Sequence, residues 1–224
     1  MMNSDGEKAD AMDNLLRKAV QSGSVGEIVA AVQRGADINA RDEGGETALT
    51  YATSVEWGPE RARECVRALI GLGARVSEEQ PDGGLGTSVH QAAAHGYTEA
   101  LRELLSADGK VALNTFDDMS RTPLICAVDN GRLVEASLLL DAGADVDAND
   151  SEKIGNTALI HAVRERNLPM VKLLVTHGAD PTIPGWMQLS ALDRARDWAV
   201  GSPAPALREI FELLESEAKR RKRI

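Results

Sequence analysis

The sequence predicts an all-α solenoid, in which short helix-turn-helix units stack side by side and are joined by polar, hairpin-like loops. Two phrases, Gly-Ala-Asp and Thr-x-Leu, recur in register with a period near 35 residues. Between the phrases, apolar residues follow helical spacing twice in each period. Aromatic residues make up only 3% of the chain, so we expect a core of Ala, Leu and Val, which suits closely packed helices.

The Thr-x-Leu phrase marks where the first helix of a unit begins. Its copies start at Thr47, Thr87, Thr122, Thr157 and Ser190, and their spacings are 40, 35, 35 and 33 residues. A Thr at a helix start caps free backbone amides, and a proline in the first turn, such as Pro123, gives up no donor that the helix needs. A helix is therefore expected after each copy.

The unit that opens at Thr122 shows two apolar stripes, one for each predicted helix. The first stripe contains Leu124, Ala127 and Val128, and the second contains Leu133, Val134, Leu138 and Leu139. Gly131 separates the two segments. This pattern is typical of a short antiparallel helix pair.

The Gly-Ala-Asp phrase closes the second helix of a unit. It occurs at residues 35–37, 143–145 and 178–180, with the variant Gly-Ala-Arg at 73–75, and the spacings are 38, 70 and 35 residues. A left-handed residue ends many helices, and Gly adopts that conformation at little cost.

Small residues recur at one phase of the first helix and let neighbouring helices approach closely. They are Ala19, Ala52, Ala92, Ala127, Ala162 and Ala195. One unit alone cannot bury its apolar face, so the whole stack is expected to be the domain.

On these residues the chain resembles the ankyrin-repeat proteins, whose repeat carries T-P-L-H-x-A and closes with G-A-D-x-N. Residues 122–127, Thr-Pro-Leu-Ile-Cys-Ala, keep all of the opening signature except the His, and the unit of Thr87 keeps that His as His90. Residues 35–40 match the closing phrase throughout. The resemblance implies a stack that binds other proteins through its hairpin tips and inner-helix ends. It also implies that His90 hydrogen-bonds the loop between repeats.

The resemblance covers residues 12–218 as a single ankyrin-repeat domain. Its expected units are residues 12–42, 43–80, 81–116, 117–150, 151–183 and 184–218, between a flexible N-terminus at 1–11 and a basic C-terminal tail at 219–224. The first and last helices are polar on one side, as the end units of a solenoid must be. Residues 54–61 insert a loop in unit two, and insertions in solenoids commonly map to the working face.

Charge and composition narrow the class of partner. The net charge is −10, yet the last six residues hold five of the 25 basic side chains, so 20 basic and 35 acidic residues leave −15 on the body. Such a body repels phosphate backbones and attracts basic proteins.

Cys65 and Cys126 are expected to be reduced core thiols. The first residues lack the apolar region of a signal peptide, and no apolar run nears a membrane span, so a cytoplasmic protein is expected.

Several segments superficially suggest cofactors. Residues 145–153, DVDANDSEK, begin like a calcium loop, but Asp150 stands where that loop needs Gly and Asn156 where it needs Glu. Residues 82–86 are glycine-rich but lack the Lys-Ser/Thr of a phosphate loop. The histidines show no metal-ligand pairing, and no nucleophile recurs beside an acid. We therefore expect no metal, no cofactor and no enzymatic activity.

The candidate partner-binding surface combines apolar residues at hairpin tips with residues at inner-helix ends. Tip positions are normally polar, so large apolar side chains there indicate protein-binding hot spots. The tip candidates are Phe116, Met119, Arg121, Ile154, Trp186 and Met187; the inner-helix and insertion candidates are Trp57, His95, Asp129, Asn130, Arg164, Glu165 and Trp198.

The main expectation is a non-enzymatic module that binds a protein, preferably a basic one, and acts as an inhibitor or immunity-type protein. One alternative is a nucleic-acid or nuclear adaptor that acts through the basic tail, although i,i+4 acids in the same helix also suit a solvated helix end. The other is an enzyme with a site in the groove.

Overall fold

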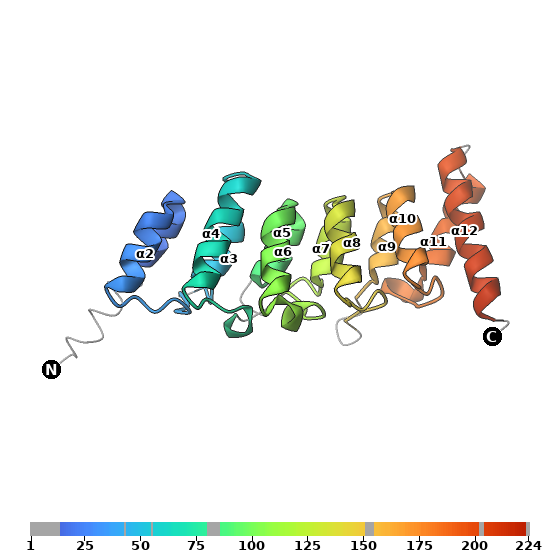
Figure 1. Cartoon of the computed structure of the whole chain (residues 1–224). Helices are drawn as coiled ribbons and strands as arrows, with labels where there is room; N and C mark the ends of the chain where they lie inside the picture. Colours follow the sequence, from blue (N-terminus) through green and yellow to red (C-terminus); the bar gives the residue numbers. More distant parts are fainter. Residues whose placement is uncertain are drawn as a thin grey trace.

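The computed structural model describes residues 14–42, 44–54, 56–79, 86–150, 155–201 and 204–222. Over these residues the chain is all-α, and helix pairs follow one another in a single extended row (Figure 1). Within the described ranges, β-pairing is limited to an isolated antiparallel bridge between Pro184 and Ser190. The predicted fold class is confirmed.

Each predicted unit contains two helices. Residues 14–22 are helical, and the elements that follow are α2 (Val25–Gln33), α3 (Ala48–Ser54), α4 (Pro59–Gly71), α5 (Ser88–His95), α6 (Thr98–Ser106), α7 (Pro123–Asp129), α8 (Leu133–Asp141), α9 (Ala158–Arg164), α10 (Leu168–Thr176), α11 (Ala191–Gly201) and α12 (Pro205–Arg221). In the described loops, short 3-10 segments occur at η1 (Val76–Glu78), η2 (Gly109–Ala112) and η3 (Trp186–Gln188).

The helices form two layers. First helices pack on first helices, in the order α3, α5, α7, α9 and α11, and second helices pack on second helices, in the order α2, α4, α6, α8, α10 and α12. The six alanines at the shared phase are all buried, with exposed fractions from 0 to 3%. Neighbouring first helices approach closely because these side chains are small, as the sequence predicts.

The helix ends match the predicted capping chemistry. The side chains of Thr122 and Thr157 accept hydrogen bonds from the amides of Ile125 and Ile160, both at 3.3 Å. Gly143, which follows α8, has a φ of 102°, a conformation that residues with a Cβ rarely adopt. The two recurring phrases therefore mark the start and the end of each helix pair.

The basic residues 219–221 continue α12. Glu217, nearly buried, accepts hydrogen bonds from Arg220 at 2.7 and 2.8 Å and from Arg221 at 3.1 Å. Arg221 also reaches back to the carbonyl of Gly178 and lies 3.5 Å from Asp180. Part of the basic segment thus closes the end of the stack.

Both cysteines, Cys65 and Cys126, are buried and carry free thiols, in agreement with the sequence analysis. Among the helices of the described ranges, none has the length and apolar character that crossing a membrane requires. The described side chains also contain no cluster of three or more His, Cys, Asp or Glu residues suited to hold a metal ion.

Candidate functional site

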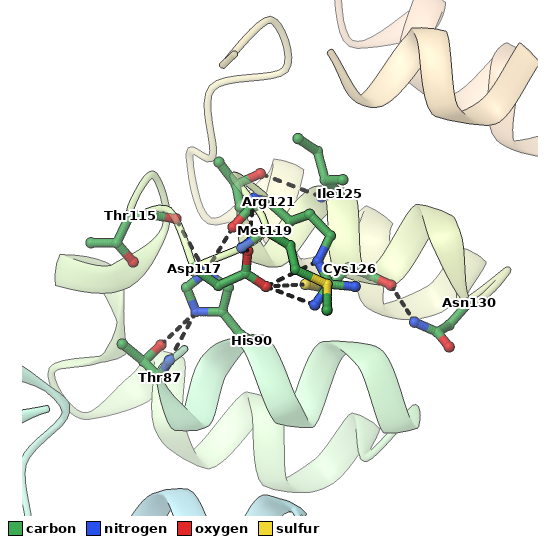
Figure 2. A network of polar contacts seen from close by, with 10 residues as sticks. Thr87, His90, Thr115, Asp117, Met119, Arg121, Ile125, Cys126 and Asn130 are labelled. Atoms are coloured by element: carbon green, nitrogen blue, oxygen red, sulfur yellow. Dashed lines mark hydrogen bonds and ion pairs between the residues drawn. The ribbon is translucent and has the colours of Figure 1, made fainter. Parts of the chain in front are cut away.

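The hairpin of residues 117–121 presents Met119 at its tip (Figure 2). One carboxylate oxygen of the buried Asp117 accepts hydrogen bonds from the amides of Met119 and Arg121, both at 2.9 Å. The backbone amide of Asp117 donates to the carbonyl of Arg121 at 2.9 Å. Met119 is 71% exposed, so a rigid loop holds an apolar side chain in solvent.

The second oxygen of Asp117 binds the guanidinium of Arg121. The Nε and Nη2 atoms of Arg121 lie 2.9 and 2.7 Å from this oxygen, a charge-assisted arrangement that is stronger than a neutral hydrogen bond. Arg121 is a predicted partner contact, and its guanidinium also holds the hairpin in place.

His90 supports the same hairpin from the preceding unit, as the family resemblance implies. Its Nδ1 atom accepts from the amide of Thr87 at 3.1 Å, and its Nε2 atom lies 3.1 and 3.2 Å from the carbonyls of Thr115 and Arg121 (Figure 2). Burial lowers the pKa of His90 to about 4, although Asp117 opposes this shift. The imidazole is therefore neutral near pH 7 and donates from Nε2.

The hairpin of unit six presents Trp186 and Met187. These side chains are 58% and 64% exposed. The amide of Trp186 donates to the Asn156 side chain at 3.0 Å, and its carbonyl accepts from Arg194 at 3.2 Å. Met187 and Gln188 have φ angles of 62° and 60°. Two consecutive left-handed residues resemble the type I′ turn, which favours Asn and Gly at these positions.

The inner-helix ends of units four and five are joined by a polar network. The Nδ1 atom of His161 lies 2.6 Å from an oxygen of Asp129, and the Nη2 atom of Arg164 lies 3.5 Å from the same oxygen. Arg164 also pairs with Glu165 at 3.3 Å. The structure thus brings together the predicted residues Asp129, Arg164 and Glu165. It adds His161, which the sequence analysis left out of the candidate surface.

Asn130 is exposed at the end of α7, where its side-chain amide donates to the carbonyl of Cys126 at 2.9 Å. The Cys126 thiol is buried nearby, and burial raises its pKa to about 12, although the charge of Arg121 opposes this. A thiol with this pKa carries almost no thiolate near pH 7 and is a weak nucleophile.

The other aromatic candidates are less available to a partner. Trp57 and Trp198 are half-buried against the core, and the guanidinium of Arg166 lies 5.5 Å from the ring centroid of Trp198. The ring of His95 stacks on Tyr97 with centroids 5.4 Å apart. Phe116 is half-buried, and Ile154 lies outside the described residues.

The stacked helix pairs place this chain in the class of repeat solenoids, in which each unit packs only on its neighbours. A family model described as ankyrin repeats (3 copies) matches residues 60–150 and 89–185, which together span more than half of the chain. The chain belongs to the ankyrin-repeat family. Ankyrin repeats are generally protein–protein interaction modules and are typically non-enzymatic.

Solved structures agree with this assignment. The ankyrin repeat protein EF0377 is 28% identical, with a TM-score of 0.74 over 91% of this chain and 97% of that chain. An ankyrin repeat domain from Acinetobacter baumannii AYE is 27% identical, with a TM-score of 0.73 over 90% and 96%. The human ASB11 ankyrin repeat domain is 26% identical, with a TM-score of 0.69 over 89% and 81%. A search of curated proteins finds no match.

Proposed function

We propose that this chain is a non-enzymatic module that recognises a partner protein through one surface, the binding face. The binding face comprises Met119, Trp186 and Met187 at the hairpin tips and Asp129, Asn130, Arg164 and Glu165 at the inner-helix ends. It combines large apolar anchors with surrounding charges, which is the composition of a protein-binding hot spot.

The observation that carries this proposal is the backbone of the unit-six hairpin. Met187 and Gln188 both adopt left-handed conformations, which cost residues other than Gly on the order of 1–3 kcal/mol each. Such a cost persists where the surrounding structure enforces it, and it clusters at functional sites. Here the strained backbone holds Met187 in solvent next to Trp186. Both side chains are largely exposed, so burial of these side chains does not offset the cost of the strain.

Rigidity supports the same interpretation. The Met119 hairpin is held by Asp117 and His90, and the Trp186 backbone is held by Asn156 and Arg194. A loop that is ordered before binding loses less conformational entropy when a partner docks. Both tips are therefore suited to act as preformed anchors.

A basic partner is favoured by charge. The chain carries a net charge of −10, and two of the cations near its C-terminus form ion pairs, Lys219 with Glu215 at 2.9 Å and Arg220 with Glu217 at 2.7 Å. Long-range attraction accelerates the association of oppositely charged proteins. We extend the proposal to an inhibitor or immunity-type role, in which the binding face covers a basic enzyme or toxin in the cytoplasm.

Affinity capture from the native cells tests this proposal. The wild-type chain is expected to retain a partner that the Met187→Asp variant loses, because the new carboxylate lies where an apolar anchor docks. Val111 is 58% exposed in η2, outside the binding face, so Val111→Asp is the matched control and should retain the partner. Capture of the same proteins by wild type and Met187→Asp would contradict the proposal.

The nucleic-acid alternative makes a different prediction. A chain that acts through residues 219–224 would bind nucleic acid with an affinity that falls steeply with salt, and removal of those residues would abolish binding. The binding-face proposal expects the full chain to bind no nucleic acid under the same conditions.

A further inference from the structure

Glu79 is a buried carboxyl group at the junction of units two and three. It follows η1 and is 7% exposed. Its Oε1 atom accepts hydrogen bonds from the hydroxyls of Thr47, at 3.2 Å, and Thr50, at 3.0 Å, at the start of α3. Its Oε2 atom accepts from the amide and hydroxyl of Ser88, at 2.8 and 2.9 Å, at the start of α5. One side chain therefore ties together the first helices of two neighbouring units.

All four of these donors are neutral. Asp117, a second buried carboxylate in a described loop, is paired with the guanidinium of Arg121 at 2.7 Å. An ionised group that is buried without a cation is disfavoured relative to its neutral form. Burial accordingly raises the pKa of Glu79 to about 7, although hydrogen bonds from Ser88, Thr50 and Thr47 lower it.

Charged groups around η1 are engaged with other partners. Glu78 pairs with Arg75 at 3.2 Å, and the Nε atom of Arg41 donates to the Glu78 carbonyl at 2.8 Å. Asp108, from the loop at η2, accepts hydrogen bonds from the amides of Val76 and Ser77 at 3.0 and 3.1 Å. These charges fix the backbone of η1, whereas burial and hydrogen bonds determine the pKa of Glu79.

The helices on either side add two more titratable groups. Glu46 precedes Thr47, and its pKa is raised by burial and by Asp42, while Arg17 opposes the shift. His90 lies one turn into α5 and is neutral near pH 7, since burial lowers its pKa to about 4. The junction therefore offers Glu79 no strong cationic partner from these neighbours.

We propose that Glu79 is a proton-operated clasp, which holds units two and three together most firmly when its carboxyl group is protonated and loosens the junction when it ionises. The protonated group donates to a hydroxyl of Thr50 or Ser88, because those hydroxyls rotate and accept as well as donate. Each repeat contacts only its neighbours, so a weaker junction lets the N-terminal units open separately from the rest.

The direction of the pH effect follows from the raised pKa. The folded chain binds this proton more tightly than the unfolded chain, whose Glu has a pKa near 4.5. The contribution of Glu79 to stability is therefore complete below pH 4.5 and is lost as the pH rises through about 7. This behaviour is separate from partner binding, and either proposal can fail alone.

The test compares wild type with Glu79→Gln in urea unfolding at about pH 5 and about pH 8. Gln stays neutral, and its amide donates to the Thr hydroxyls while its oxygen accepts from Ser88. Between these pH values, the unfolding constant of wild type should increase about 100-fold more than that of the variant. The variant should be the more stable protein at about pH 8. Glu78→Gln, one residue away and only half-buried, is the control and should keep the wild-type pH dependence.

A carbon-13 NMR titration of the Glu79 carboxyl group in the wild-type chain gives a readout that does not depend on any variant folding. A midpoint near 7 is expected. A midpoint near 4.5 would contradict the proposal. An equal pH dependence of the free energy of unfolding in wild type and Glu79→Gln would also contradict it.

Discussion

The Nδ1 atom of His161 lies 2.6 Å from the carboxylate of Asp129, so a side chain of α9 is joined to the end of α7. Arg164 approaches the same carboxylate from one turn further along α9, at 3.5 Å. The link spans two repeats and orients the charged part of the binding face.

Asp129→Ala should therefore release both His161 and Arg164. Because the network is only partly buried, we expect a loss of about 1 kcal/mol in the free energy of unfolding, measured by urea denaturation. Asp141→Ala is the control, since Asp141 is exposed and pairs with His177 at 3.6 Å. An equal loss in the two variants would show that the contact between Asp129 and His161 contributes no more to stability than an exposed ion pair does.

His90 should control the stability of the Met119 hairpin. His90→Ala removes the hydrogen-bond partner of the Thr87 amide and of the Thr115 carbonyl, and it leaves the Arg121 carbonyl with only the amide of Asp117, so a loss of about 2–4 kcal/mol is expected. The lowered folded pKa makes the unfolded state bind more protons between about pH 4 and 6.5. Wild-type stability should fall as the pH drops through that window. The free energy of unfolding of His90→Asn should depend less on pH than that of wild type in this window. Parallel pH profiles of the two proteins would contradict this prediction.

Arg121 should contribute strongly to the stability of the folded chain, because it is the cation paired with the buried Asp117. Arg121→Ala leaves the carboxylate of Asp117 buried without a cation, and a loss of about 2–4 kcal/mol is expected after allowing for the partial exposure of Arg121. Arg164→Ala, at an exposed ion pair, should cost less than about 1 kcal/mol. Chemical denaturation measures both losses. Similar losses in the two variants would show that Arg121 does not support the hairpin more than an exposed arginine does.

In the unit-six hairpin, relief of backbone strain should raise stability, whereas loss of the Met187 side chain should weaken binding. Met187→Gly and Gln188→Gly should each raise the free energy of unfolding by about 1 kcal/mol, since Gly adopts a left-handed conformation at little cost. Gln188→Gly keeps the Met187 side chain and should bind the partner normally, whereas Met187→Gly should bind more weakly. A thermal melt and a capture assay on each variant check this, and no gain in stability from either would mean that the turn is unstrained.

Calcium should have no effect on the stack. The acidic residues of 145–150 are explained by the closing phrase of unit four, in which Asp145 accepts from the amide of Asp147 at 3.0 Å. Millimolar calcium should leave the melting temperature unchanged. A rise that chelator reverses would restore the metal-site interpretation of this segment.

The sequence predicted the repeat architecture well because spacing alone carries it. The buried alanines and the capping threonines occur once per period, so their phase could be recognised without coordinates. The polar network was harder to predict, since Asp129 and His161 lie 32 residues apart and meet only when two units are stacked. Glu79 was missed for a related reason: it lies in an irregular loop, outside the repeating phrases, and its burial depends on Thr47 and Ser88 from two different units.

Exposure was the other property that the sequence did not determine. Met119, Trp186 and Met187 are exposed at tips, whereas Trp57 and Trp198 lie partly against the core. A tryptophan in a loop or at a helix end can turn toward either solvent or protein, and its rotamer is set by neighbours that only the fold supplies. Arg121 illustrates the same point for a charged residue, because its partner Asp117 is in its own hairpin.

If the binding face holds a partner through preformed apolar tips, the affinity for that partner must depend on those tips. The decisive measurement is the dissociation constant of the captured partner for wild type, Trp186→Ala/Met187→Asp and Val111→Asp. We expect the double variant to bind at least about 100-fold more weakly, as is usual when hot-spot residues are lost, while the affinity of Val111→Asp and the melting temperatures of both variants stay close to wild type. Wild-type affinity in the folded double variant would contradict it.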